Sequence, residues 1–242
     1  MLDLDGGWRT LADGLRRAAE AAGATLRTGA RVTSVDAMDS VVNGVTLADG
    51  TRIPARAVVL ATSPGAASAL LPASAALAGY ARDLVPVRAS CLDVALSALP
   101  ARRSLFALGI DRPLHASVHS ATARLAPEGG AVIHLLHYAP SDDARADEAE
   151  LLALLDLLQP GWRDVLVEKR FLPSMVAHNA LAMAPTGGLA GRPGPDVPGT
   201  TGLYLSSRAP TADATLAPWP MLSLFLVTRC STPWTERRSS GR

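Results

Sequence analysis

A chain of 242 residues is long enough for one large domain or two small ones, and 48% apolar residues is ordinary for a globular protein. The net charge of +1 argues against nucleic acid as a partner. Two cysteines make no disulfide framework, and no stretch approaches the ~20 apolar residues of a membrane span. We therefore predict a cytoplasmic protein without a transmembrane segment, and peripheral membrane contact stays open.

The first predicted element is an amphipathic helix. Apolar residues recur at helical spacing from Leu11 to Ala22, and Gly23 marks its end. A short strand, Ala24 to Arg27, should follow. Residues 30–54 are rich in β-branched residues and predict an antiparallel meander, in which Asp49-Gly50 is a strong hairpin signal.

The next apolar segment, Ala57 to Ala61, does not alternate, so we expect both of its faces to be buried in a parallel sheet. Thr62-Ser63-Pro64-Gly65 follows its carboxyl end. Ligands of open α/β sheets bind at that edge. Ala61, Thr62 and Pro64 are therefore candidate ligand-binding residues.

The middle of the chain predicts helices and antiparallel strands. A helical stretch around Leu70 to Leu77 is interrupted by Pro72, and a second helix begins after Ser141-Asp142-Asp143 and ends before Pro160-Gly161. The predicted strands are Cys91 to Leu96, Leu114 to Ser120, Ala131 to Tyr138 and Val165 to Phe171. A Gly/Pro loop (183–202) precedes a short strand, Gly202 to Leu205, and periodicity is lost after it.

Four of the histidines are candidates for metal ligands. His134 and His137 would lie on opposite faces of one strand, and His115 and His119 would share a face without an acidic or Cys partner nearby in sequence. We therefore predict no metal site, and histidines that are satisfied or exposed. Motifs of hydrolases, nucleotidases and zinc proteases are absent from the sequence.

Five segments of the chain carry a resemblance to a known family: residues 5–36 (DGGWRTLADGLRRAAEAAGATLRTGARVTSVD), 47–64 (LADGTRIPARAVVLATSP), 160–175, 187–193 and 202–205. In this order they resemble the FAD-dependent phytoene desaturase and amine oxidase superfamily, in particular the bacterial phytoene-dehydrogenase-like oxidoreductases. The resemblance implies an α/β fold with an α+β insertion: a partial, Rossmann-like FAD-binding parallel sheet with a β-meander, and an antiparallel-sheet substrate domain. It also implies FAD as the cofactor, with Val32 beside the adenine and Ala61 to Pro64 near the cofactor's middle.

The implied domains are residues 1–65 (partial FAD-binding domain), 66–180 (substrate-type domain), 181–205 (return to the FAD-binding domain) and 206–242 (a divergent, disordered tail). The sequence departs from the family pattern at two places. It has no Gly-x-Gly-x-x-Gly turn, and Ser206-Ser207-Arg208 stands where Ala-Gly-Asp is expected. In such sheets the missing strands lie between segments like 24–27 and 57–61, so we expect unpaired strand edges, at about 1–3 kcal/mol for each unsatisfied buried group.

Two hypotheses follow. In the first, the chain is an FAD-dependent oxidoreductase, or a fragment of one, that acts on an apolar, isoprenoid-like small molecule by hydride transfer to flavin, with no catalytic residue nominated. In the second, it is an inactive truncated or frameshifted remnant, or one half of a split flavoprotein with an N-terminal half as its partner chain. A binding module built on the middle domain alone is a third, weaker idea.

Overall fold

The computed structural model describes residues 3–191, 193–206 and 224–227. These residues form two compact units. We call residues 3–26 and 84–191 the five-stranded unit, and residues 27–83, 193–206 and 224–227 the β4 unit. The domain boundaries drawn from the sequence stay predictions. Of the predicted tail, residues 207–223 and 228–242 lie outside the described residues.

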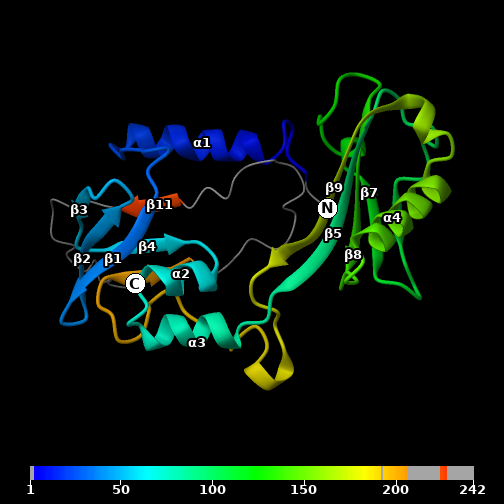
Figure 1. The fold of residues 1–242 in the computed structure, drawn as a ribbon. Coiled ribbons are helices and arrows are strands. Elements are labelled where there is room, and N and C mark those ends of the chain that lie inside the picture. Colours follow the sequence, from blue (N-terminus) through cyan, green and yellow to red (C-terminus); the bar gives the residue numbers. More distant parts are fainter. Residues whose placement is uncertain (1–2, 192, 207–223, 228–242) are drawn as a thin grey trace, which may run out of the picture. The chain divides into compact units, whose positions relative to one another are not determined.

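The five-stranded unit is built on one antiparallel sheet, as predicted for the middle of the chain (Figure 1). Its strand order is β6-β7-β8-β5-β9. The strands are β5 (Val87–Leu96), β6 (Phe106–Leu108), β7 (Leu114–Val118), β8 (Ala131–Tyr138) and β9 (Leu166–His178). The sequence pattern missed β6 and the second half of β9, and the chain leaves β7 through a 3-10 turn, η1 (His119–Ala121).

The helix α4 (Ala144–Leu158) covers one face of this sheet. It begins as predicted, because the Asp143 side chain accepts hydrogen bonds from the N–H groups of Arg145 and Ala146 at 2.9 and 3.3 Å. Its buried leucines, Leu151 and Leu155, belong to the same core as the apolar residues of β5 and β8. A 3-10 turn, η2 (Trp162–Val165), follows the helix.

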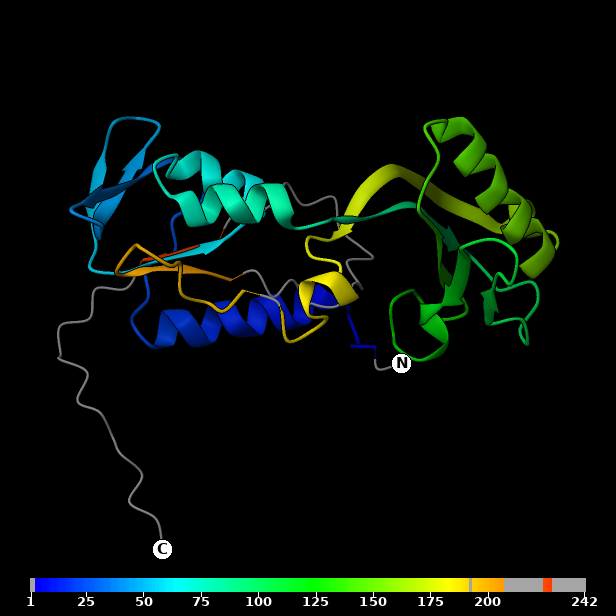
Figure 2. The ribbon, with the colours of Figure 1, turned by 90° about the horizontal axis from the view of Figure 1, so that it is seen from below.

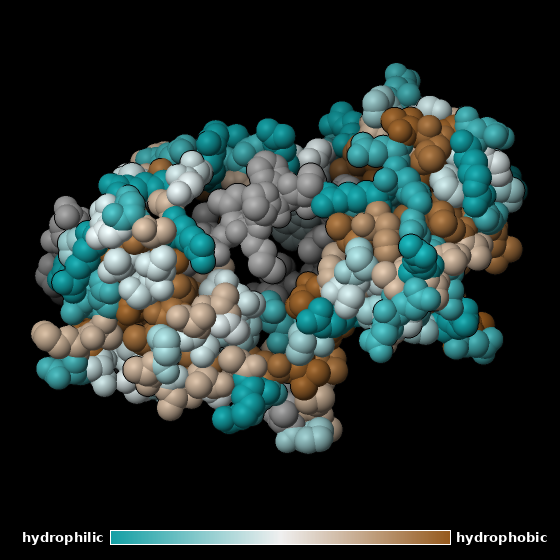
Figure 3. Space-filling model, viewed as in Figure 1, coloured by the Kyte–Doolittle hydropathy of each residue, from teal (hydrophilic) through white to brown (hydrophobic). Residues whose placement is uncertain are grey.

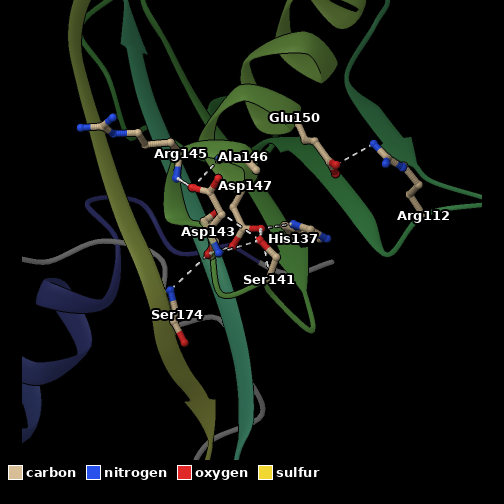
Figure 4. A network of polar contacts seen from close by, with 10 residues as sticks. Arg112, His137, Ser141, Asp143, Arg145, Ala146, Asp147, Glu150 and Ser174 are labelled. Atoms are coloured by element: carbon tan, nitrogen blue, oxygen red, sulfur yellow. Dashed lines mark hydrogen bonds and ion pairs between the residues drawn. The ribbon is translucent and has the colours of Figure 1, made fainter.

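One carboxylate of α4 points into a polar network beside the sheet (Figure 4). Asp147 is 1% exposed and accepts hydrogen bonds from Ser90 Oγ at 2.7 Å and from Ser141 Oγ at 2.8 Å. Its Oδ1 lies 3.2 Å from His137 Nδ1, and the N–H of Ser174 donates to Ser90 Oγ at 3.1 Å. Burial raises the pKa of the Asp147 carboxyl, but the hydrogen bonds and His137 outweigh burial and hold this pKa below its usual 3.8.

The helix α1 (Trp8–Ala21) forms as predicted and ends before Gly23, whose φ is 85°. None of its residues is buried, although its apolar residues recur at helical spacing. The predicted strand over residues 24–27 is wrong, since these residues form no strand. A strand needs a neighbour for its N–H and C=O groups, and the described residues offer none there.

The β4 unit contains two small sheets. The meander β1 (Val32–Met38), β2 (Val41–Leu47) and β3 (Arg52–Pro54) is antiparallel, as predicted. Its second hairpin turns at Asp49-Gly50, where Gly50 has a φ of 83° and the Leu47 N–H donates to the Thr51 carbonyl at 2.9 Å.

The second sheet has the order β10-β4-β11. β4 (Val58–Ala61) pairs in parallel with β10 (Leu203–Leu205) and antiparallel with β11 (Leu224–Val227). The expectation of an unpaired edge is therefore wrong at β4, and residues 224–227 form a strand where we predicted a disordered tail. The reason is that the backbone of β11 satisfies the hydrogen-bonding groups of that edge.

Two helices follow β4: α2 (Pro64–Leu70) and α3 (Ala75–Asp83). The predicted interruption near Pro72 is confirmed, and the two helices lie side by side (Figure 2). The expectation that both faces of β4 are buried is only half right, because Val58 and Leu60 are fully buried whereas Val59 and Ala61 are half-buried. A last 3-10 turn, η3 (Ala184–Thr186), lies in the Gly/Pro loop. No helix among the described residues is long and apolar enough to cross a membrane.

Candidate functional site at the carboxyl edge of β4

The parallel pair β4 and β10 brings two carboxyl ends to one edge of a sheet. Leu203 lies opposite Val58, and Leu205 lies opposite Leu60. The pairing continues past β10, because the Ser206 N–H donates to the Leu60 carbonyl at 2.9 Å. The residues that follow Leu60 and Leu205 therefore leave the sheet together, at the edge where α/β proteins bind ligands.

Three of the four predicted site residues lie at this edge. Ala61 ends β4, Thr62 follows it, and both are half-buried. Pro64 is buried as the first residue of α2, where its lack of an N–H costs nothing. Ser63 caps the helix, since its Oγ accepts a hydrogen bond from the Ala66 N–H at 3.3 Å. The strand–turn–helix geometry is thus as predicted, and ligand contact at these residues stays a prediction.

The fourth predicted site residue, Val32, begins β1 and is 9% exposed. It belongs to the same apolar core as Val58 and Leu60, and β1 lies against α2. The structure therefore gathers all four residues in the β4 unit. The side chain of Val32 serves the core, and a contact between its backbone and adenine stays a prediction.

Gly202 is a further residue of this edge that sequence reasoning did not single out. Its φ is 80°, and its carbonyl accepts a hydrogen bond from the Val58 N–H at 2.8 Å. A Cβ at this position would lie 2.6 Å from the Arg56 carbonyl oxygen. The close approach of β10 to β4 therefore requires glycine here. The signal was a glycine directly before a strand, which marks such approaches.

The meander carries a shallow hollow of about 470 Å³, lined in part by Asp36, Asn43 and Arg52. Its polar groups satisfy one another. Arg52 Nε lies 3.1 Å from Asp36 Oδ2, and Arg52 Nη2 donates to Asn43 Oδ1 at 2.7 Å. We therefore do not assign a ligand to this hollow.

The histidines of the five-stranded unit mostly have carboxylate partners. His134 Nδ1 lies 2.6 Å from Asp93 Oδ1, and His119 Nδ1 lies 2.9 Å from Asp3 Oδ1. The placement of His119 on a strand is wrong, because it begins η1. A local sequence pattern could not indicate its acidic partner, because Asp3 lies 116 residues away in sequence. No group of three or more metal-ligating side chains gathers within the part of the chain that the structure describes.

The comparisons with known proteins agree with this geometry. The family model of the FAD dependent oxidoreductases (DAO) matches residues 1–218. The chain therefore belongs to the FAD dependent oxidoreductases, and FAD is the cofactor of this family. None of the curated proteins matches the chain.

Solved structures of an oxidoreductase and of two oxidases share the fold. An oxidoreductase from Methanosarcina mazei is 18% identical with a TM-score of 0.63, over 83% of this chain and 49% of that chain. Glycine oxidase from Bacillus cereus is 15% identical with a TM-score of 0.52, over 81% and 48%. A redesigned putrescine oxidase is 14% identical with a TM-score of 0.58, over 83% and 47%. The chain spans about half the length of these structures, and the likeness shows the fold alone.

FAD carries a pyrophosphate, which flavoproteins hold with N–H groups at a helix N-terminus. The N-terminus of α2 offers few of them, since in its first turn only the Gly65 N–H has no hydrogen bond among the described residues. Pro64 has no N–H, the Ala66 N–H is taken by Ser63 Oγ, and the Ala67 N–H donates to the Ser63 carbonyl at 2.9 Å. The N-terminus of α2 therefore does not fit the pyrophosphate, and the predicted contacts of Ala61, Thr62 and Pro64 concern other parts of the cofactor.

Proposed function

We propose that the chain forms part of an FAD-dependent oxidoreductase that oxidises an apolar, isoprenoid-like small molecule, in the manner of the bacterial phytoene-dehydrogenase-like oxidoreductases. The observation that carries the proposal is the parallel β4–β10 pair, with Ala61, Thr62 and Pro64 at its carboxyl edge. Family membership supports FAD as the electron acceptor. The segments that resemble phytoene-dehydrogenase-like enzymes support the apolar substrate.

The role of the described residues in this function is to shape and line the site. The half-buried side chains of Ala61 and Thr62 are small enough to let a flat ring system approach the sheet edge. The five-stranded unit would supply the surface for the substrate, as substrate domains of this family do. We assign no acid or base, because removal of hydride from an apolar substrate is the chemistry of the flavin.

Titration of the purified chain with FAD tests the proposal. Binding should shift the visible absorbance bands of the flavin and quench its fluorescence. Ala61→Glu should weaken binding by placing a charge at the edge, whereas Ala69→Glu, on the exposed side of α2, should bind as the natural chain does. Equal binding by both variants would remove the β4 edge from the site, and no flavin signal at all would defeat the proposal for this polypeptide.

The poor fit to the pyrophosphate favours a second candidate, in which this chain is one half of a split flavoprotein. An N-terminal partner chain would then supply the Gly-rich turn. Adding a polypeptide with a strand, a Gly-x-Gly-x-x-Gly turn and a helix should in that case create FAD binding that the chain alone lacks. Binding by the chain alone contradicts this candidate, and no binding in either experiment supports an inactive truncated or frameshifted remnant.

A further inference from the structure

The face of the five-stranded sheet opposite α4 carries a row of polar side chains. In the strand register, Asp93 of β5 lies opposite His134 of β8, and His134 lies opposite Ser117 of β7. Directly opposed residues of antiparallel strands project from the same face. The three side chains therefore stand next to one another across three neighbouring strands.

Asp93 fixes the hydrogen-bonding role of the histidine. A carboxylate only accepts hydrogen bonds, so the contact of 2.6 Å between Asp93 Oδ1 and His134 Nδ1 places a proton on Nδ1. In the neutral ring this leaves Nε2 as an acceptor. His134 is 1% exposed, and its Nε2 is buried with no hydrogen-bond partner among the described residues.

The next residue in the row is unsatisfied as well. Ser117 is 6% exposed, and its Oγ is buried with no hydrogen-bond partner in the described part of the chain. Folded proteins rarely leave buried polar atoms unpaired, and two such atoms at directly opposed positions call for a shared explanation. One ligand hydroxyl satisfies both, because it donates to His134 Nε2 and accepts from Ser117 Oγ.

The same face continues into apolar surface that is open to solvent. Phe106 of β6 lies opposite Ser117, and Leu108 follows two residues later on the same side of the strand. These side chains are 57% and 65% exposed. Figure 3 shows that hydrophobic residues reach the surface of this unit at several places, without identifying them singly. An aliphatic chain attached to the bound hydroxyl would lie over Phe106 and Leu108.

We propose that Asp93, His134 and Ser117 form a binding site for the hydroxyl group of an aliphatic alcohol, whose chain packs on Phe106 and Leu108. The proposal rests on the proposed function for the apolar body of the ligand, and it adds one hydroxyl group to that substrate class. In this group of residues, His134 accepts the hydrogen bond from the alcohol, and Asp93 is a positioning residue.

The site is closed in this structure. The ring of His119 packs edge-to-face on His134 with 4.4 Å between ring centroids. The Asp3 carboxylate holds this ring through a hydrogen bond with His119 Nδ1. The Thr122 hydroxyl donates to the other oxygen of Asp3. A ligand therefore enters after the His119 ring moves, and the contacts of Asp3 oppose that movement.

Two probes with the same apolar chain test the site: 1-octanol and its methyl ether, 1-methoxyoctane, which accepts a hydrogen bond but donates none. The full chain, labelled with ¹⁵N, should bind 1-octanol about tenfold more tightly, as expected for one additional hydrogen bond of ordinary strength. The ¹⁵N signal of His134 Nε2 should shift with 1-octanol alone. Equal affinities for the two probes, or an Nε2 signal that saturating 1-octanol leaves unchanged, would overturn the proposal.

Ser117→Ala is the informative variant, because the Ser117 hydroxyl has no partner to leave behind and the fold should tolerate its loss. It should lower the affinity for both probes, because the oxygen of each accepts a hydrogen bond from Ser117 Oγ. The tighter binding of 1-octanol should remain, because it comes from donation to His134 Nε2. Ser104→Ala, in the loop before β6, is the matched control and should bind both probes as the natural chain does. A Ser117→Ala chain that binds both probes as tightly as the natural chain does contradicts the site. All measurements are made without FAD, so failure of alcohol binding is distinct from failure of flavin binding.

Discussion

The two units of this chain build their cores in different ways. In the five-stranded unit, β5 is hydrogen-bonded along its length to both β8 and β9, and the 15-residue helix α4 covers one face of the sheet. In the β4 unit, two separate sheets are made of strands of three to seven residues, and the helices have seven and nine residues.

The two units are held together by different combinations of contacts. The long strands of the first unit bury large side chains, such as Leu135 and Leu155, which are 0% exposed. The short strands of the second unit also bury large side chains, such as Leu60 and Leu203, and in addition their backbones approach one another closely at two glycines. A Cβ at Gly44 or Gly202 would come within 2.5 Å of the Ile53 carbonyl oxygen or 2.6 Å of the Arg56 carbonyl oxygen, respectively. Truncation of a leucine under α4 therefore tests the core of the first unit, and an added Cβ at Gly202 tests the close strand pairing of the second.

The largest effect is expected from truncating the core under α4. Leu155→Ala removes a fully buried side chain and should lower the free energy of unfolding of the five-stranded unit by about 2–5 kcal/mol. Leu157→Ala, on the same helix but 80% exposed, should change it by less than about 0.5 kcal/mol. Hydrogen exchange of the β5 and β8 amides measures the loss of stability in this unit alone. Similar losses for the two variants would contradict the assigned packing of α4.

Gly202→Ala is the corresponding change in the β4 unit. A left-handed backbone alone costs an L-residue about 1–2 kcal/mol, and the new Cβ must in addition push the Arg56 carbonyl away. Gly199 has a φ of 76° but open space around it, so Gly199→Ala isolates the cost of strain. Exchange of the β4 amides should accelerate clearly more in Gly202→Ala. If both variants behave alike, the close approach of β10 to β4 is not needed for stability.

The elements that could be predicted from the sequence are those whose signals are local. The Asp49-Gly50 turn and the Asp143 cap of α4 depend on residues within a few positions, and both formed as predicted. The segment 24–27 has the composition of a strand but lacks a strand neighbour, and residues 224–227 became a strand only through pairing with β4. Partners distant in sequence decided both outcomes, and a local pattern carries no information about them.

The candidate sites divide in the same way. The position of Ala61, Thr62 and Pro64 at a sheet edge could be predicted, because a strand, a turn and a helix follow one another directly. The need for glycine at position 202 depends on the Arg56 carbonyl in another segment. The pairing of His134 with Asp93 likewise depends on the strand register, which brings residues 41 positions apart face to face.

The helix α4 also buries a polar side chain, that of Asp147. Asp147→Asn should cost about 1–3 kcal/mol, because two serine hydroxyls then face an amide that offers them one acceptor atom fewer. The pKa of this carboxyl is lower in the folded state, so its contribution is present above the unfolded pKa and is lost as the pH falls through the folded pKa. Urea denaturation at pH 6 and at stepwise lower pH measures the stability lost in the variant and the dependence of that loss on pH.

The variant Asp147→Asn should therefore lose less stability on acidification than the natural chain does. Asp142→Asn, an exposed neighbour before the helix, is the control and should follow the natural pH profile. Identical acid profiles for the natural chain and Asp147→Asn would show that the network in Figure 4 does not hold the carboxylate in its charged form.

The smallest effect is expected at the start of α2, where it separates helix capping from cofactor binding. Ser63→Ala removes the hydroxyl that caps the Ala66 N–H and should cost about 1 kcal/mol locally, measured as faster exchange of the α2 amides. Ser63→Asp keeps a capping oxygen and should preserve α2. Since the N–H groups of Ala66 and Ala67 are already used, we expect no anion here. Unlike the carboxylate of Ala61→Glu, that of Ser63→Asp would be held by the Ala66 N–H, so this variant should leave FAD affinity unchanged. A marked loss of FAD affinity in Ser63→Asp, with α2 intact, would instead place the negative charge of the cofactor at this helix and reverse the conclusion drawn from its geometry.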